Sequence, residues 1–289
     1  MADVYEIKNR IDGLKSIHNV TYAMQIVTIS RLKRINMQLQ GVKESLGQVK
    51  EHLAHLVAEH PAFSSTFYPE VDEEKPPVLV MVFSNRGFCG SFNQDVMQAT
   101  KVYCTQHGIN FDSAIKFGVG KKSKVILGED TPGVYYAVPE KDLFSKDEGV
   151  ALFDQLNVFM KENRRIYFAY FAFKSIISQK VVIDSYYPPA REDFQFDTPA
   201  WGAPQYLEPN RDIVEQQMLS FYYYLKLFQA IRDSASSEFS QRFLLMKSAV
   251  DNVNTLRDEL SLELNKERQR SITQEISEII STFKALSKA

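Results

Sequence analysis

The chain has 289 residues, of which 44% are hydrophobic and 24% charged, enough for one or two domains with an ordinary core. A net charge of −2 argues against a dedicated nucleic-acid-binding protein, whose domain would be clearly basic. Two cysteines are too few for a disulfide framework, and neither a membrane-span-length apolar run nor a signal-peptide core is visible, so we expect a soluble, cytoplasmic, bacterial protein.

The first segment, residues 1–60, predicts one long helix that ends before Pro61. Apolar residues in its second half follow one another in steps of three and four, which is the spacing of a coiled-coil seam with a left-handed supercoil. These residues are Leu32, Ile35, Leu39, Val42, Leu46, Val49, Leu53 and Leu56. We therefore expect this helix to pair with a second long helix.

Residues 62–77 are acidic and contain prolines, which is typical of a linker. The following domain, predicted over 76–190, alternates short apolar or β-branched runs with amphipathic stretches. Strands are predicted at 78–83, 114–119, 135–138, 165–173 and 180–187, and helices at 93–107, 121–127 and 147–162. Strands that alternate with helices favour a mostly parallel sheet covered by helices, so a Rossmann-like α/β domain is expected.

The last segment, 210–289, predicts a second long helix, because residues 212–286 contain neither glycine nor proline. At 1.5 Å per residue this helix would be about 110 Å long, too long to be buried in a chain of this size. It must lie against another long element or project into a partner. Antiparallel pairing with residues 1–60 is the simplest arrangement, and Asp212 with Glu215 is the expected cap at its start.

The turn 84–93 lies between the first predicted strand and a helix, where α/β proteins place phosphate-binding loops. Its glycines have the spacing G-x-x-G rather than G-x-G-x-x-G, and no Lys-Ser or Lys-Thr pair follows. A tight turn that uses glycine for its backbone freedom is therefore favoured over a nucleotide site. The histidines and cysteines lack the spacing of a metal site, so neither a metal nor a cofactor is expected.

Cys89 in this turn could act as a nucleophile, which would make the chain a small α/β enzyme with a coiled-coil arm. A cysteine nucleophile needs a nearby base, and neither His18 nor His107 lies in a recognisable partner motif. A structural thiol is the favoured interpretation.

Two polar groups on the long helices are candidates for contact with partners. Arg31, Lys33 and Arg34 form a basic cluster, which is either a solvated face or a collar that meets acidic loops of a surrounding protein. Residues 265–275 are polar on nearly every face of the predicted helix, and apolar residues then recur at helical spacing up to Leu286. Such a stretch is commonly exposed surface, but a charged girdle followed by an apolar tip also suits a helix whose end lies in an apolar sleeve.

Several stretches resemble the gamma subunits of F-type ATP synthases. The first helix carries I-K-N-R-I at 7–11, V-T-Y-A-M at 20–24 and S-R-L-K-R at 30–34. The turn N-R-G-F-C-G at 85–90 resembles the family signature D-R-G-L-C-G. The last helix carries M-K-S-A-V-D-N at 246–252, N-K-E-R-Q at 265–269 and S-I-T-Q-E-I at 271–276. These motifs follow the order of the family and cover both ends and the middle of the chain.

The resemblance implies a rotating central stalk, which couples the flow of protons or sodium ions through a membrane ring of c subunits to ATP synthesis or hydrolysis. It implies partners (an alpha and beta hexamer, an epsilon subunit and the c-ring), a peripheral position at the cytoplasmic face of a bacterial membrane, and no catalytic residues in this chain. By the same resemblance, Arg268, Gln269 and Thr273 match a beta-subunit contact. Met24 matches the neighbouring contact on the first helix.

Five residues depart from the family pattern. Tyr22 stands where the family has lysine, Asn85 replaces the aspartate of the signature, and Phe88 replaces its leucine. Glu267 and Arg270 place opposite charges where small residues are common in the family, next to the residues that match the beta-subunit contact. Besides the central stalk, two other functions are compatible with the sequence: the enzyme with a Cys89 nucleophile, and a coiled-coil scaffold that does not rotate.

Overall fold

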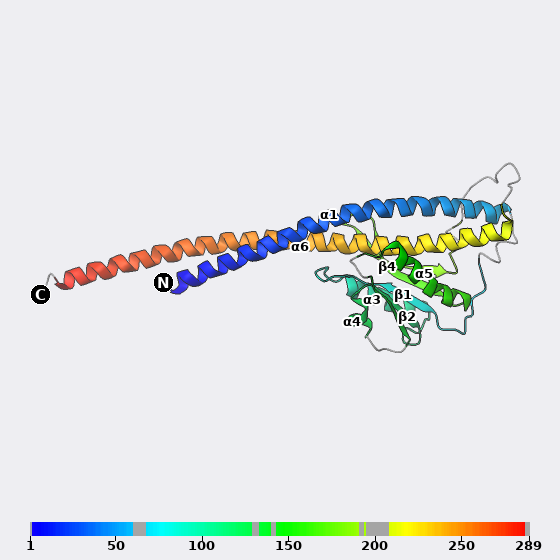
Figure 1. The fold of residues 1–289 in the computed structure, drawn as a ribbon. Coiled ribbons are helices and arrows are strands. Elements are labelled where there is room, and N and C mark those ends of the chain that lie inside the picture. Colours follow the sequence, from blue (N-terminus) through cyan, green and yellow to red (C-terminus); the bar gives the residue numbers. More distant parts are fainter. Residues whose placement is uncertain are drawn as a thin grey trace. The chain divides into compact units, whose positions relative to one another are not determined.

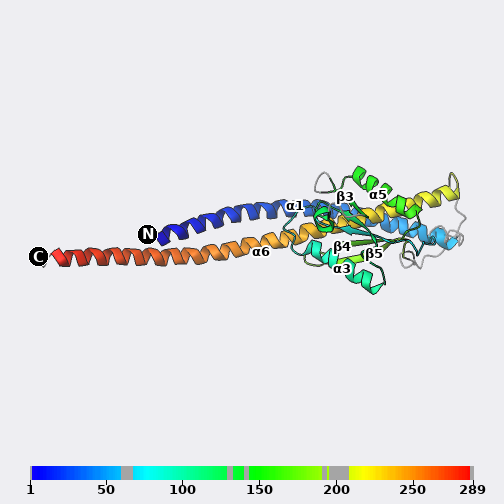
Figure 2. The same ribbon diagram turned by 90° about the horizontal axis from the view of Figure 1, so that it is seen from below.

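Two very long helices open and close the chain in the computed structural model, which describes residues 2–59, 68–128, 133–139, 143–190, 194 and 208–286 (Figure 1). Helix α1 spans Ala2–Glu59 and helix α6 spans Arg211–Leu286. The chain divides into two compact units. Unit 1 comprises Met1–Ile29 and Phe243–Ala289, and unit 2 comprises Ser30–Arg242. Within each unit the α1 and α6 segments lie side by side and run in opposite directions (Figures 1 and 2).

The strands of unit 2 form one five-stranded sheet in the order β3-β2-β1-β4-β5. All neighbours are parallel except β4 and β5, which form an antiparallel pair. The strands are β1 (Val78–Val82), β2 (Ile115–Val119), β3 (Val134–Ala137), β4 (Ile166–Phe173) and β5 (Gln179–Tyr187). This arrangement confirms the predicted mixed α/β fold with a mostly parallel, Rossmann-like sheet.

Strand β1 is buried on both faces, as its unbroken apolar run predicts. Val80 and Val82 belong to a cluster shared with α1, α5 and α6, whereas Met81 packs with Phe92 and Val96 of α3. The helices that flank the sheet are α3 (Phe92–Gln106), α4 (Ser123–Leu127) and α5 (Lys146–Lys161). The sheet therefore separates α3 from the long helices, and the main core lies on the side of α6.

Helix α5 begins with a capping box. The Ser145 hydroxyl accepts a hydrogen bond from the Glu148 backbone N–H at 3.2 Å, and the Glu148 carboxylate accepts one from the Ser145 N–H at 2.7 Å. One turn further on, Gly149 meets the ring of Phe228 on α6 so closely that an added Cβ would lie 2.2 Å from it. The absence of a side chain at Gly149 thus sets how closely α5 packs against α6.

The seam predicted on α1 lies in unit 2 and is buried. Seven of its eight residues have less than a tenth of their surface exposed, and Val42 is half-buried. Leu46, Leu53 and Leu56 share their cluster with Tyr222 and Leu225 of α6. This packing confirms the long helical pair that the spacing predicted.

Helix α6 is buried more widely than an apolar stripe predicts. Nearly every residue from 222 to 242 is buried, including charged ones, because in unit 2 this segment packs against both α1 and the sheet. Asp233 is 1% exposed and accepts hydrogen bonds from Lys43 Nζ at 2.8 Å and from the Phe173 N–H at 3.3 Å. Burial raises the pKa of Asp233, and the bond from Lys43 opposes that rise.

Two predictions for α6 are wrong in detail. The side chain that caps its start is Asn210, whose Oδ1 accepts from the Ile213 N–H at 2.9 Å, and not Asp212 with Glu215. The steps of three and four between the apolar residues from Val214 to Phe228 predict that Phe221 lies on the apolar face of α6, but it is 46% exposed. The prolines at 188, 189, 199, 204 and 209 also predict a loop before α6. Residues 191–193 and 195–207 of this loop lie outside those the structure describes, as do residues 62–67 of the linker.

Candidate functional site

Arg268, Gln269 and Thr273 lie together on one stretch of α6 in unit 1, and all three are exposed. The Thr273 hydroxyl donates to the Gln269 carbonyl at 2.9 Å, so it is engaged within the helix. Next to them Arg270 forms an ion pair with Glu267 at 3.1 Å. The side chains of Arg268 and Gln269 thus present a guanidinium and an amide on the helix surface, where both can form directional hydrogen bonds with a partner.

Met24 lies in the same unit on α1 and is half-buried. Its carbonyl accepts a hydrogen bond from the Thr28 hydroxyl at 2.6 Å, and Thr28 is itself buried. Neighbouring positions leave large apolar side chains exposed, with Val20, Tyr22 and Ile26 each at least half exposed. Val20 lies one turn before Met24 on the same face, so this face offers apolar contact area beside a methionine, a side chain that adapts to irregular surfaces. Tyr22 and Ile26, by contrast, lie on the opposite side of α1.

The basic cluster Arg31, Lys33 and Arg34 lies in unit 2, so the structure places it in the other unit from Met24 and Arg268. Lys33 and Arg34 are exposed, and Arg31 is half-buried. The buried seam of α1 begins at this cluster, where Leu32 and Ile35 pack with Ala235 and Phe239 of α6. Lys33 and Arg34 accordingly point away from the seam, whereas Arg31 lies beside it, one turn before Ile35.

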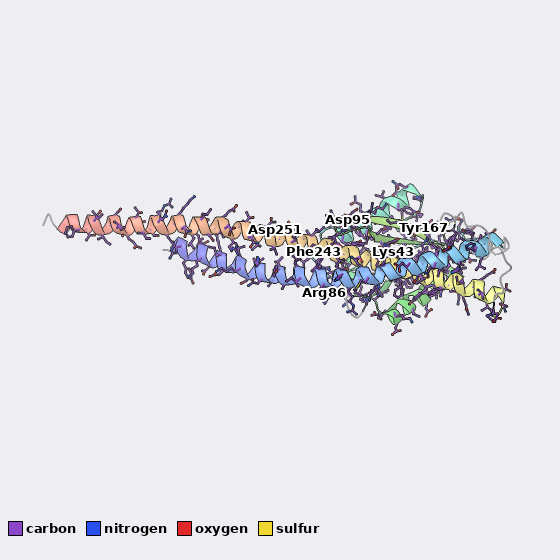
Figure 3. All side chains as sticks on the ribbon, turned by 90° about the horizontal axis from the view of Figure 1, so that it is seen from above. Lys43, Arg86, Asp95, Tyr167, Phe243 and Asp251 are labelled. Carbon is purple, nitrogen blue, oxygen red and sulfur yellow. The ribbon has the colours of Figure 1, made fainter. Side chains whose placement is uncertain are left out.

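The apolar positions near the end of α6 are exposed. Ile272, Ile276, Ile279 and Phe283 have between 51% and 73% of their surface exposed. In Figure 3, side chains project from both sides of α6 between the labelled Asp251 and its C-terminal end. A helix that presents isoleucines and phenylalanine to solvent leaves apolar area for a partner to cover.

The turn after β1 is held by α6 through charged groups. Glu238 accepts hydrogen bonds from the backbone N–H groups of Asn85 and Arg86, at 3.1 and 3.3 Å. Arg242 donates to Glu238 at 2.6 Å, to the Gly87 carbonyl at 3.0 Å and to the Arg86 carbonyl at 3.1 Å. Burial raises the pKa of Glu238, whereas Arg242 and the two backbone N–H groups oppose that rise.

The geometry of this turn argues against both a nucleotide site and a Cys89 nucleophile. A cavity here, lined by Glu238 and Gly120, has a volume of only about 10 Å³, room for one water molecule and far below a nucleotide. Cys89 is 3% exposed and its Sγ lies 3.6 Å from the Arg86 carbonyl oxygen. Burial raises the pKa of Cys89, the opposite of what a nucleophile needs.

Sequence reasoning missed Glu238 and Arg242. The available signal was their spacing, since a glutamate followed by an arginine four residues later forms an ion pair on one face of a helix. Within the described residues, no group of three or more histidine, cysteine or acidic side chains is placed to hold a metal. No helix among them is long and apolar enough to cross a membrane.

Residues 3–286 match the profile of a protein family described as ATP synthase. The ATP synthase gamma chain of Burkholderia lata is 28% identical over 301 residues, covering 97% of this chain and 98% of the relative. The ATP synthase gamma chain of Burkholderia multivorans is likewise 28% identical with the same coverage.

Solved structures with the same fold come from two mitochondrial ATP synthases. One is the rotor of Euglena gracilis ATP synthase, with a TM-score of 0.63 and 18% identity over 94% of this chain and 99% of that chain. The other is the central stalk and c-ring structure of Tetrahymena thermophila ATP synthase, with a TM-score of 0.59 and 18% identity over 80% of this chain. The likeness covers the paired long helices and the central sheet.

Proposed function

Since this chain belongs to the ATP synthase family, in which it is a gamma subunit, we propose that its paired helices turn inside a hexamer of alpha and beta subunits. The exposed side chains of unit 1 are the observation that carries this proposal. A polar stretch with Arg268 and Gln269 is followed along α6 by exposed isoleucines and Phe283. Isolated in water such a surface has no partner, whereas an apolar sleeve around the helix would cover it.

The candidate contact residues have separate roles in this proposal. Arg268 and Gln269 form orientation-specific hydrogen bonds with one beta subunit, while Met24 and Thr273 border that contact. Arg31, Lys33 and Arg34 form a collar against acidic loops. A rotor can bias a nucleotide site only by contacting its conformational states unequally, and directional polar bonds provide such a difference.

The chain supplies no catalytic group of its own in this proposal. The alpha and beta subunits carry the nucleotide chemistry, and the epsilon subunit and the c-ring contact unit 2. The complex lies at the cytoplasmic face of a bacterial membrane, to which this chain is attached through the c-ring. Support comes from the turn after β1, where a nucleotide has no room and the one thiol is buried.

The test is an ATP synthase complex assembled with the double variant Arg268→Ala and Gln269→Ala. Loss of charge-assisted hydrogen bonds to the beta subunit should lower the rate of ATP-driven ion pumping by about tenfold. Lys161→Ala on α5 is the matched control, because it also removes an exposed cation but lies outside the contact. Equal pumping by the double variant and the control would overturn the assigned contact. ATP turnover by the purified chain alone would overturn the non-catalytic role.

A further inference from the structure

The turn after β1 lies where α/β proteins of this topology bind ligands. β1 has β2 on one side and β4 on the other, so the order of the parallel strands reverses at β1. Ligands in such sheets bind beyond the carboxyl ends of the strands at this point of reversal. Residues 84–90 follow the carboxyl end of β1 directly, and the chain turns sharply at Phe88 and Gly90, whose φ angles are 59° and 62°.

The groups that meet there are those that bind an oxyanion. Two successive backbone N–H groups, of Asn85 and Arg86, point at one carboxylate, and the Arg242 guanidinium approaches it at 2.6 Å. Converging backbone N–H groups with an adjacent arginine are a common binding arrangement for phosphate and carboxylate groups. The carboxylate belongs to Glu238 of α6, so the ligand comes from within the chain.

An ordinary ion pair on one helix does not require this arrangement. Glu238 and Arg242 are four residues apart and would pair without help from the turn. Here the Glu238 and Arg242 side chains are each only 4% exposed, and the guanidinium also donates to the carbonyl groups of Arg86 and Gly87. The pair therefore joins the backbone of the turn, both its donors and its acceptors, to α6.

We propose that residues 84–90 are an oxyanion-binding turn whose permanent ligand is the Glu238 carboxylate. A small external carboxylate takes its place when that side chain is shortened. Arg242 is the positioning residue that keeps the carboxylate against the turn. This inference concerns the folded chain itself and does not depend on rotation or on contact with a beta subunit.

The test is chemical complementation of the full-length chain. Glu238→Ala removes the carboxylate, so the two N–H groups lose this acceptor and Arg242 keeps its bonds to the carbonyl groups of Gly87 and Arg86. Sodium acetate at about 0.1 M should then raise the Tm of this variant by about 2 °C above its value in sodium chloride of equal ionic strength. The wild-type chain and Glu263→Ala, which lacks an exposed glutamate of the same helix, should show equal Tm values in the two salts. Equal responses of all three proteins to acetate would overturn the proposal.

A second variant decides the matter if Glu238→Ala does not fold in either salt. Glu238→Gln keeps the size of the side chain but replaces one acceptor oxygen by a donor, which faces the N–H groups of the turn. The backbone amides of Asn85 and Arg86 should then exchange with solvent deuterium about tenfold faster than in the wild type. Unchanged protection of these amides would show that the carboxylate is not their ligand.

Discussion

Both cysteine side chains are enclosed by the α/β part of unit 2. Cys89 and Cys104 are 3% and 1% exposed, and burial raises the pKa of each thiol. The thiolate is the form that reacts with alkylating reagents, so both the lack of access and the raised pKa slow the reaction. We expect iodoacetamide to modify the folded chain at pH 8 on the order of 100-fold more slowly than the urea-unfolded chain.

Mass spectrometry of time points at fixed reagent concentration measures both rates, and the unfolded chain is the control for intrinsic thiol reactivity. Raising the pH should speed the reaction of the unfolded chain first, because its thiols have the lower pKa. Rapid modification of Cys89 alone in the folded chain would contradict the burial seen here and would reopen the enzyme interpretation.

Among the helices, the α1 seam is the feature whose contribution to the free energy of unfolding is most directly testable. Leu53 is fully buried in the cluster it shares with α6, whereas Met37 on the same helix is 63% exposed. Leu53→Ala should lower the free energy of unfolding by about 3 kcal/mol, because a cavity remains where the side chain was. Met37→Ala, which removes a comparable volume from the surface, should change it by less than about 0.5 kcal/mol.

Urea unfolding of the two variants beside the wild type gives both values. If Met37→Ala costs as much as Leu53→Ala, the face of α1 that meets α6 has been assigned wrongly.

The elements of this fold were predictable because their signals are local. Period-three-and-four spacing identified the seam on α1, and β-branched and aromatic runs identified β4 and β5. The burial of α6 from residue 222 to 242 was not predictable, because its charged and serine residues look like those of an exposed face. Their partners, such as Asn85 for Glu238 and Lys43 for Asp233, are far away in the sequence.

The candidate contact residues present the opposite case. Arg268 and Gln269 were named from a resemblance, and the structure adds only that they are exposed on α6. A contact with another subunit leaves no mark in the chain that makes it, apart from surface left uncovered. The Asn210 cap was missed for a simpler reason, since Asp212 two residues later has an equally suitable side chain.

For the molecule as a whole, burial along α6 is very unequal. Residues 222–242 are almost all buried, whereas residues 272–283 are all exposed. Helices in water derive most of their stability from packing, so the exposed segment should open far more often. We expect its amides in the isolated chain to exchange on the order of 1,000-fold faster than those of 222–242, measured by hydrogen exchange and mass spectrometry.

Assembly into the complex provides the comparison for this experiment. The proposed sleeve should slow exchange at 272–283 and leave 222–242 unchanged, because the latter segment is already covered within the chain. Similar exchange of both segments in the isolated chain would contradict the unequal burial.

Gly149 adds a mechanical consequence to this picture. Its hydrogen-only side chain leaves room for the Phe228 ring, whereas Leu152 and Phe153, one turn further along the same side of α5, carry side chains too large for that space. If α5 slid along α6 by one turn in that direction under load, one of these larger side chains would be driven against the ring. The close contact at Gly149 therefore opposes sliding of α5 along α6, so a force applied to one helix is transmitted to the other.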